Sequence, residues 1–172
     1  KMKKEYQDVI TSYLGVEPIE INSALVSTQN RKRLYWTNLK GVEQPKDKGI
    51  LLKDIISTGK IDRDKSLCLT QRYCCFQGSQ AYLRRRYFGK AMGQAFFENI
   101  EPMLQKAFFK NKPFEETDQL GSIRSLSQNE CERLQTVPEG YTSRASIYES
   151  KRMLGNGWAV DVITHILQSD IS

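Results

Sequence analysis

Hydrophobic and polar positions are ordered most clearly near the start of the chain. Apolar residues recur every three or four positions over residues 6–14, which predicts an amphipathic helix that ends at Gly15. Apolar and polar residues then alternate over residues 19–24, which predicts a strand, and a second strand is expected over residues 34–39. Paired apolar positions within residues 50–56 predict a short helix.

The pattern is poorer from residue 60 to about residue 121. Residues 67–70 form a candidate strand, residues 74–93 mix glycines, aromatics and arginines without a period, and residues 96–109 are hydrophobic but fit neither period clearly. We interpret this stretch as a small inserted module of short strands and loops.

Regular spacing returns at Ile123. Ser127 and Glu130 have the spacing of a capping box, which predicts a helix that runs to about Gln135. Leu126 and Cys131 occupy the positions of a hydrophobic staple around the same helix start. Two further helices are expected, over residues 147–154 and over residues 158–167, the last with inward-facing apolar residues at Trp158, Val162, Ile163 and Ile166.

The chain has 172 residues, enough for one domain or for a small domain and part of another. Its formal net charge is +6. The basic residues cluster beside aromatic ones, which is compatible with nucleic-acid binding, but composition alone favours a solvated surface. The clusters are Arg31 to Arg33, Arg84 to Arg86, and Arg63 with Lys65 and Arg72.

The cysteines and the apolar runs narrow the class of protein. The four cysteines contain no Cys-x-x-Cys pair and only one histidine, His165, is present, so a zinc site is not expected and reduced, buried thiols are favoured. No run of about 18 apolar residues occurs, so we expect no membrane span. The basic N-terminus has no apolar stretch behind it, so a signal peptide is not expected.

Three blocks of sequence resemble the C-terminal motifs of the DNA cytosine-5 methyltransferases. The first block, residues 29–35, contains Gln29, Arg31 and Arg33 in a Gln-x-Arg-x-Arg pattern. The second block, residues 124–138, is similar to the family pattern Arg-x-Leu-Thr-x-x-Glu-x-x-Arg-Leu-Gln-x-x-Pro. The third block, Gly-Asn-Gly-Trp at residues 155–158, resembles the family's Gly-Asn-Ser-Val motif. Their order, with about 90 residues between the first two, makes the resemblance specific.

The resemblance implies an α/β fold that is the C-terminal portion of a Rossmann-like methyltransferase core with an inserted small mixed α+β target-recognition domain. It divides the chain into a core segment at 1–59, the target-recognition domain at 60–122, and a return to the core at 123–172. The family's Phe-x-Gly-x-Gly, Pro-Cys and Glu-Asn-Val motifs do not occur in the sequence. The chain is therefore expected to begin just after Glu-Asn-Val, and none of its cysteines is expected to be the nucleophile.

The resemblance also assigns roles to residues of the first and third blocks. Arg33 would bind the target cytosine at O2, where negative charge develops when the ring is attacked. Arg31 projects to the same side of an extended segment, and it would brace the site or hold phosphate. Asn156, Gly157 and Trp158 would close over the methionine and adenosine end of S-adenosyl-L-methionine, while packing in the core is the alternative for Trp158.

Double-stranded DNA is the implied partner. Arg124 has two interpretations, a phosphate contact or an ion pair. Phosphate contacts position a protein on DNA and contacts to base edges specify the sequence. The DNA-binding candidates are Gln29, Lys65, Thr70, Arg72, Arg84, Arg85, Arg86 and Arg124, with Gln71 and Gln77 as further candidates for base contacts.

The implied function is target recognition for a DNA cytosine-5 methyltransferase that is inactive without its N-terminal half. That half would come from the same gene or from a separate subunit, and the exposed strand 19–24 would otherwise favour self-association. A cytoplasmic prokaryotic or phage protein is favoured over a nuclear one. The alternatives are a non-catalytic DNA-binding or regulatory protein that kept the module, and an unrelated basic α/β domain.

Overall fold

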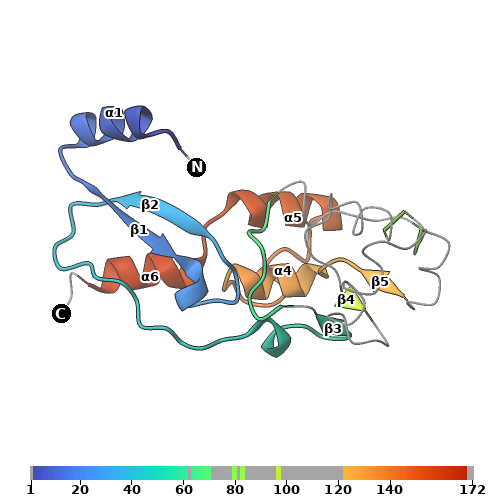
Figure 1. The fold of residues 1–172 in the computed structure, drawn as a ribbon. Helices are drawn as coiled ribbons and strands as arrows, with labels where there is room; N and C mark the ends of the chain where they lie inside the picture. Colours follow the sequence, from blue (N-terminus) through green and yellow to red (C-terminus); the bar gives the residue numbers. More distant parts are fainter. Residues whose placement is uncertain are drawn as a thin grey trace, which may run out of the picture.

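The computed structural model describes residues 2–61, 63–70, 79–80, 82–83, 96–97 and 122–169 (Figure 1). The first half contains α1 (Lys4–Leu14), β1 (Pro18–Asn22), β2 (Lys32–Trp36) and two 3-10 turns, η1 (Ser23–Leu25) and η2 (Leu52–Asp54). Three short strands follow, β3 (Lys60–Ile61), β4 (Phe96–Phe97) and β5 (Ile123–Arg124). The chain then forms α4 (Gln128–Leu134), α5 (Ile147–Asn156) and α6 (Val160–Gln168).

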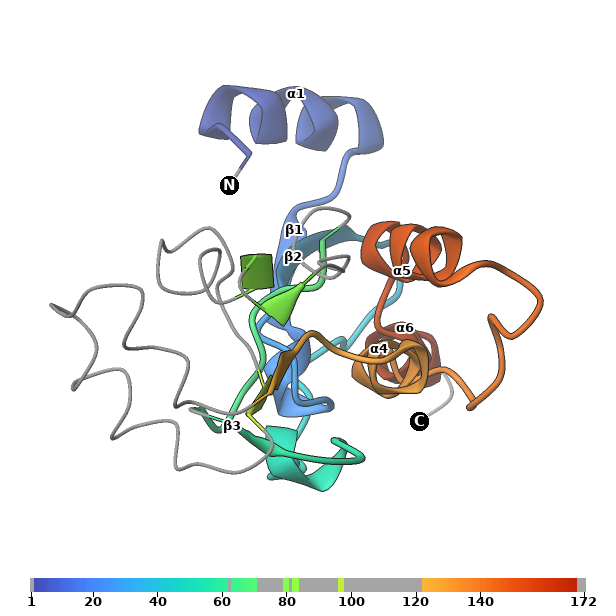
Figure 2. The same cartoon turned by 90° about the vertical axis from the view of Figure 1, so that its right-hand side faces the viewer.

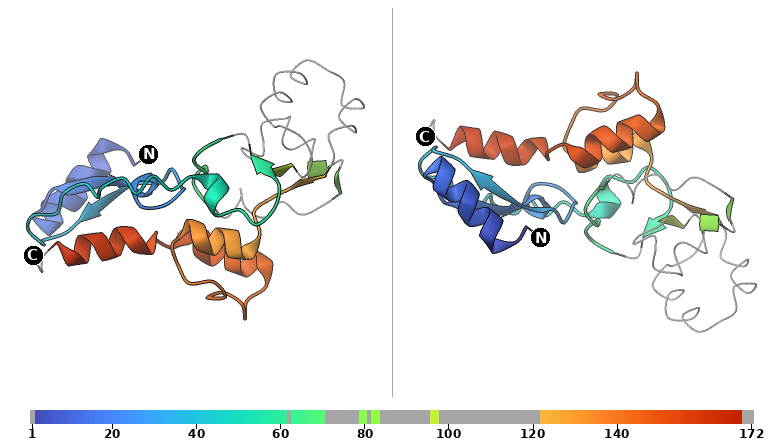
Figure 3. Two further views of the ribbon diagram at one scale, coloured as in Figure 1. Left: turned by 90° about the horizontal axis from the view of Figure 1, so that it is seen from below. Right: turned by 90° about the horizontal axis from the view of Figure 1, so that it is seen from above.

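β1 and β2 form an antiparallel pair that packs on α6. Ile21 of β1 lies opposite Arg33 of β2 in the register. Ile21 is buried in one cluster with Val162 and Ile166 of α6. Figure 3 shows α6 running beside this pair at one end of the molecule. The two predicted strands are therefore present, but β2 begins at Lys32, two residues before its predicted start, because pairing with β1 already extends the backbone of the first block.

A second buried cluster joins α4 and α5 to the middle of the chain. Leu134 of α4 and Leu154 of α5 pack with Leu52 and Leu69. The staple residues Leu126 and Cys131 belong to the same cluster, as their spacing predicted. This second cluster fixes the segment around Leu69 against the helices that carry the second and third blocks.

The short strands β3, β4 and β5 form an antiparallel sheet in that order. They lie at the end of the molecule away from α6, as Figures 1 and 3 show. β3 and β5 stand at the two boundaries predicted for the inserted module, while β4 comes from within it. Residues 67–70, a candidate strand, belong to no strand; Ser66 forms a single parallel bridge with Gln29 instead.

Four of the predicted helices are present as α1, α4, α5 and α6, but the short helix predicted over residues 50–56 is only the 3-10 turn η2. Gly15 ends α1 in a left-handed conformation, φ 68°, as expected of a C-terminal glycine. α5 continues past its predicted end to Asn156. Trp158 was predicted to face inward on the last helix, but the extended backbone of Ala159 places it before the first turn of α6, and the side chain is 66% exposed.

α1 stands apart from the other helices in Figures 1 and 2. None of its residues is buried, and its apolar face is open; Tyr13 is 87% exposed. A hydrogen bond from Trp36 Nε1 to Thr11 Oγ1 at 3.0 Å ties it to β2. No helix among the described residues is long and apolar enough to cross a membrane.

Candidate functional site

Gln29 links the first block to the second inside the protein. Its side chain is fully buried. Its Oε1 accepts a hydrogen bond from the Leu69 N–H at 2.7 Å. Its Nε2 donates to the Leu134 carbonyl at 3.2 Å and to Gln135 Oε1 at 3.4 Å. This placement departs from the expected DNA contact, because the whole amide is used to satisfy buried polar groups.

Arg31 links the first block to the third. Its Nη2 donates to the carbonyls of Gly157 and Gly155, at 2.7 and 3.1 Å. Its Nη1 donates to the Leu69 carbonyl at 2.9 Å. The residue is only 5% exposed. Arg31 therefore joins the first and third blocks inside the protein, where its guanidinium is enclosed by carbonyls.

Arg33 is exposed at the mouth of a cavity of about 440 Å³ between β2 and α6. The cavity is lined by residues of two blocks, Arg31 and Arg33 from the first and Asn156 and Trp158 from the third. Arg33 Nη1 donates to the Lys32 carbonyl at 2.9 Å, and Nη2 lies 3.6 Å from Cys68 Sγ. The cavity therefore brings together the side chains that the resemblance assigned to base binding and to cofactor binding.

Trp158 also lines a second cavity of about 580 Å³, together with Tyr141, Met153 and Ile163. Its exposed indole lies where it can present an apolar face to a bound molecule, and the size and apolar lining of both cavities suit a small-molecule site. Gly157 is different. A Cβ there would lie 3.3 Å from the Met153 carbonyl oxygen, so a larger residue would require the end of α5 to shift by a few tenths of an ångström. Asn156 and Trp158 thus line the cavity with Arg33, while Gly157 packs closely against the end of α5.

The other DNA-binding candidates divide into two groups. Lys65 Nζ donates to the carbonyls of Ile50, Ala24 and Ser27 at 2.6, 2.8 and 3.2 Å, so its ammonium is engaged inside the protein, contrary to the expected DNA contact. Thr70 is half-buried. The remaining candidates lie outside the described residues, namely Arg72, Arg84, Arg85 and Arg86 with Gln71 and Gln77.

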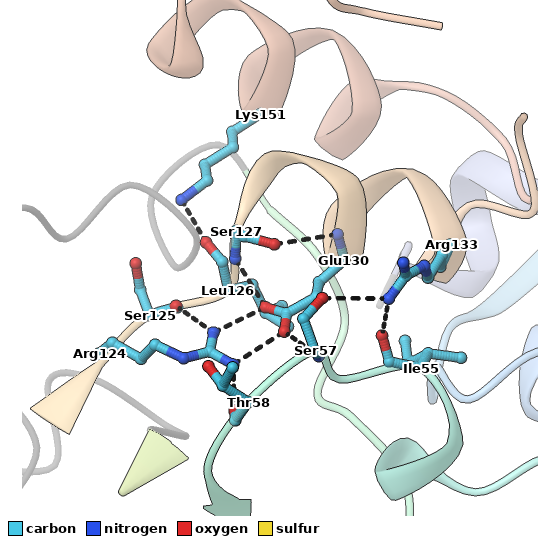
Figure 4. Close-up of polar contacts among 10 residues, drawn as sticks. All are labelled: Ile55, Ser57, Thr58, Arg124, Ser125, Leu126, Ser127, Glu130, Arg133 and Lys151. Carbon is cyan, nitrogen blue, oxygen red and sulfur yellow. Dashed lines mark hydrogen bonds and ion pairs between the residues drawn. The ribbon is translucent and has the colours of Figure 1, made fainter. Parts of the chain in front are cut away.

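Arg124 forms an ion pair, one of its two expected roles (Figure 4). Its Nη1 donates to Glu130 Oε2 at 2.7 Å and its Nη2 to Glu130 Oε1 at 2.8 Å. Nη2 also donates to the Thr58 carbonyl, and the guanidinium stacks over Phe96 at 4.7 Å from the ring centre. The Arg124 guanidinium therefore holds β5 and α4 against residues 57–58.

Glu130 is fully buried at the centre of this cluster. Its carboxylate closes the predicted capping box with Ser127, which is confirmed in both directions. The Ser57 N–H also donates to it at 2.8 Å. Burial alone would raise the pKa of Glu130, but the Arg124 guanidinium and the N–H groups of Ser127 and Ser57 outweigh burial and lower the pKa.

Glu130→Gln is expected to reduce the free energy of unfolding by about 3 kcal/mol at pH 7, because it leaves the Arg124 guanidinium without its counter-charge. Since the pKa of Glu130 is lowered in the folded state, the carboxylate stabilises the fold above its ordinary value of 4.5 and loses this effect as the pH falls through the folded value. The difference between variant and wild type should therefore shrink in acid, as measured by urea unfolding between pH 3 and pH 7.

Glu149→Gln is the matched control. Glu149 closes the same kind of capping box, with Ser146 at the start of α5, but it is exposed and has no buried arginine partner. Glu149→Gln should reduce the free energy of unfolding clearly less than Glu130→Gln does at every pH. Equal losses for the two variants would show that the capping box, and not the buried ion pair, stabilises the second block.

Sequence reasoning missed Cys68, which lies against the arginines of the first block: Arg31 Nη1 is 3.4 Å and Arg33 Nη2 is 3.6 Å from its sulfur. Gln135 joins α4 to the two helices that follow: its backbone carbonyl accepts from the Val160 N–H at 2.9 Å, and its side chain donates to the Leu154 carbonyl. No local signal pointed to Cys68, because its partners are more than thirty residues away. Gln135 carried a signal as the last residue of the Arg-Leu-Gln motif.

Two solved structures are similar to this chain across almost its whole length. A triple mutant of Spodoptera frugiperda DNMT2 aligns with 97% of the chain at 18% identity and a TM-score of 0.61. The Entamoeba histolytica methyltransferase EhMeth aligns with 95% at 15% identity and a TM-score of 0.63. The chain spans 62% and 57% of the lengths of those two proteins. At these identities the likeness shows the fold, which is the α/β fold of methyltransferases.

A search of curated proteins found no match. A family model, C-5 cytosine-specific DNA methylase, matches residues 71–171. The match includes the second and third blocks and most of the predicted recognition stretch, whereas the first block precedes it. Because the match covers more than half of the 172 residues, this chain belongs to the C-5 cytosine-specific DNA methylase family.

Proposed function

We propose that this chain is the C-terminal part of a DNA cytosine-5 methyltransferase, the enzyme that transfers a methyl group from S-adenosyl-L-methionine to C5 of cytosine. The observation that carries the proposal is the cavity where Arg31 and Arg33 meet Asn156 and Trp158. These two pairs come from blocks more than 120 residues apart, and the second pair lies within the family match. The chain would supply target recognition, a base-binding arginine and part of the cofactor pocket.

Arg33 is the residue that we place beside the reacting base. In this chemistry a thiolate, supplied by the rest of the enzyme, adds to C6 of a cytosine that has left the base stack. Negative charge then builds up on the ring and its O2 atom. A guanidinium that is already oriented and stays charged stabilises this charge without reorganisation. Both arginines line the cavity, but Arg33 is exposed and Arg31 is only 5% exposed, so we assign contact with the base to Arg33 and support to Arg31.

The cofactor would bind against the third block. S-adenosyl-L-methionine supplies the methyl group as an activated sulfonium substituent. Asn156 presents an exposed amide and Trp158 an exposed indole at the cavity. Arg31 holds the backbone between them through Gly155 and Gly157, which fixes the shape of this wall. We therefore assign Asn156 and Trp158 to ligand contact and Gly157 to backbone geometry.

The open apolar faces support a requirement for a further part of the enzyme. α1 has 11 residues and buries none, and a helix of this length is marginal in water unless an apolar face is covered. Trp158 and Met153 expose apolar surface along the second cavity. The similar structures are longer than this chain by more than a third of their own length. The remaining part of the methyltransferase core is the partner that we propose for these faces.

Binding of this chain to duplex DNA tests the proposed recognition role. We expect weak binding whose dissociation constant rises roughly ten- to a hundredfold between 50 and 200 mM salt, because lysine and arginine contacts to phosphate release counterions. Fluorescence anisotropy with a labelled duplex measures this. Binding that does not depend on salt, or no binding at 50 mM salt, would contradict a DNA-recognition role.

A pair of triple variants separates recognition from overall charge. Replacing Arg84, Arg85 and Arg86 by Gln removes three charges from the predicted recognition stretch. Replacing Lys40, Lys46 and Lys53 by Gln removes three exposed charges from elsewhere. We expect the first variant to weaken binding and to flatten its salt dependence, and the second to bind within about threefold of wild type. If both variants lost DNA affinity equally, DNA binding would depend on net charge alone.

A further inference from the structure

Cys68 lies between the two arginines of the first block. Its sulfur accepts hydrogen bonds from Arg31 Nη1 at 3.4 Å and from Arg33 Nη2 at 3.6 Å. Its thiol donates to the Leu69 carbonyl at 3.6 Å. The cysteine is half-buried and is not in a disulfide. The thiol of Cys68 thus accepts hydrogen bonds from both arginines and donates one to the Leu69 carbonyl.

The two arginines differ in how firmly they are held. Arg31 is 5% exposed and is fixed by the carbonyls of Leu69, Gly155 and Gly157. Arg33 is exposed, and among the described residues its guanidinium has one other hydrogen bond, to the carbonyl of its neighbour Lys32. Cys68 is therefore the side chain through which the loosely held guanidinium is connected to the firmly held one.

We infer that Cys68 is a positioning residue for the methyl-transfer reaction, which holds the Arg33 guanidinium at the cavity so that it faces the target base. The inference rests on the proposed function. A long arginine side chain loses rotamer freedom when it binds, and a partner that fixes the guanidinium beforehand reduces this entropic cost at the moment of reaction. The sulfur of Cys68 provides that partner from near the start of the predicted recognition stretch, 60–122.

Steady-state kinetics of the complete enzyme with Cys68→Ala and Cys68→Ser test the inference. We expect Cys68→Ala to lower kcat roughly five- to tenfold, with the KM for DNA and the unfolding temperature unchanged, because a small misplacement of a contacting group is felt in the transition state. Cys68→Ser should recover most of kcat, because its hydroxyl also accepts from a guanidinium. In the Arg33→Ala background, Cys68→Ala should have no further effect on the single-turnover rate.

Several results would overturn the inference. An unchanged kcat in Cys68→Ala would do so, as would a fall in unfolding temperature that Cys68→Ser shares, which would make Cys68 a packing residue. An additive loss in the Arg33→Ala background would show that Cys68 acts on something else. Absence of methyl transfer by the wild-type complete enzyme would overturn the proposed function, and this inference with it.

A second readout uses this chain alone and does not depend on catalysis. Nitrogen-15 relaxation of the Arg33 side-chain Nε–H group reports how firmly its guanidinium is held on the picosecond to nanosecond timescale. We expect the order parameter of Arg33 to fall in Cys68→Ala and to be restored in Cys68→Ser, with Arg31 unchanged. An order parameter for Arg33 that is the same in all three proteins would contradict the positioning role.

Discussion

Arg33→Ala in the complete methyltransferase is expected to lower kcat by roughly a hundred- to a thousandfold, the loss typical of removing one preorganised donor from a developing negative charge. Arg33 is exposed at the cavity and makes one backbone hydrogen bond and one contact to sulfur. The free energy of unfolding should therefore change by no more than about 0.5 kcal/mol. Transfer of labelled methyl groups to duplex DNA gives the rate, and urea unfolding gives the stability.

Lys32→Ala is the matched control for this prediction. Lys32 is the neighbouring exposed cation on β2, and strand alternation turns its side chain to the opposite face. Its removal changes the net charge by the same amount and should leave kcat within about threefold of wild type. Equal losses in the two variants, or full turnover by Arg33→Ala, would remove Arg33 from the reaction.

Arg31→Ala has the second large expected effect, and it falls on stability. The residue is buried, and its guanidinium donates to three carbonyls on two separate segments. Its removal leaves those carbonyls unsatisfied and opens the junction between the first and third blocks. We expect a loss of about 3–5 kcal/mol in the free energy of unfolding, a large share of the 5–15 kcal/mol typical of a domain.

Arg31→Lys should recover only part of this loss, because an ammonium cannot direct paired donors at Leu69 and Gly157 together. Urea unfolding of wild type, Arg31→Ala, Arg31→Lys and Arg33→Ala gives the comparison within one block. If Arg31→Ala were no less stable than Arg33→Ala, the hydrogen bonds that join the first and third blocks would contribute nothing to the fold.

Local rules made part of the fold predictable. The capping box of Ser127 and Glu130 could be predicted because its two residues lie within four positions of each other. α4 begins directly after Ser127, as the capping box predicts. Gly15 marked the end of α1 for the same reason. The position of Trp158 was not predictable from spacing, since apolar periodicity does not distinguish the first turn of a helix from the extended residue before it.

The roles of the basic residues depended on partners that are distant in the sequence. Lys65, Arg124 and Gln29 have side chains suited to DNA, but their donors are used by carbonyls and carboxylates of the protein itself. Residue type alone does not tell a phosphate from a backbone carbonyl as acceptor. The meeting of the first and third blocks at one cavity was implied by resemblance, and only the structure shows that Arg31 joins them.

The proposed function requires that this chain recognise and position the DNA, and that a complementary part of the enzyme be present for methyl transfer. Transfer of labelled methyl from S-adenosyl-L-methionine to duplex DNA, measured with this chain alone and with the remaining part of the core added, tests it most directly. We expect no methyl transfer by the chain alone, and transfer to C5 of cytosine when the remaining part of the core is added. Methyl transfer by the chain alone would contradict the proposed function. So would the absence of transfer by the two parts together while DNA binding persists, and that result would favour a non-catalytic DNA-binding protein.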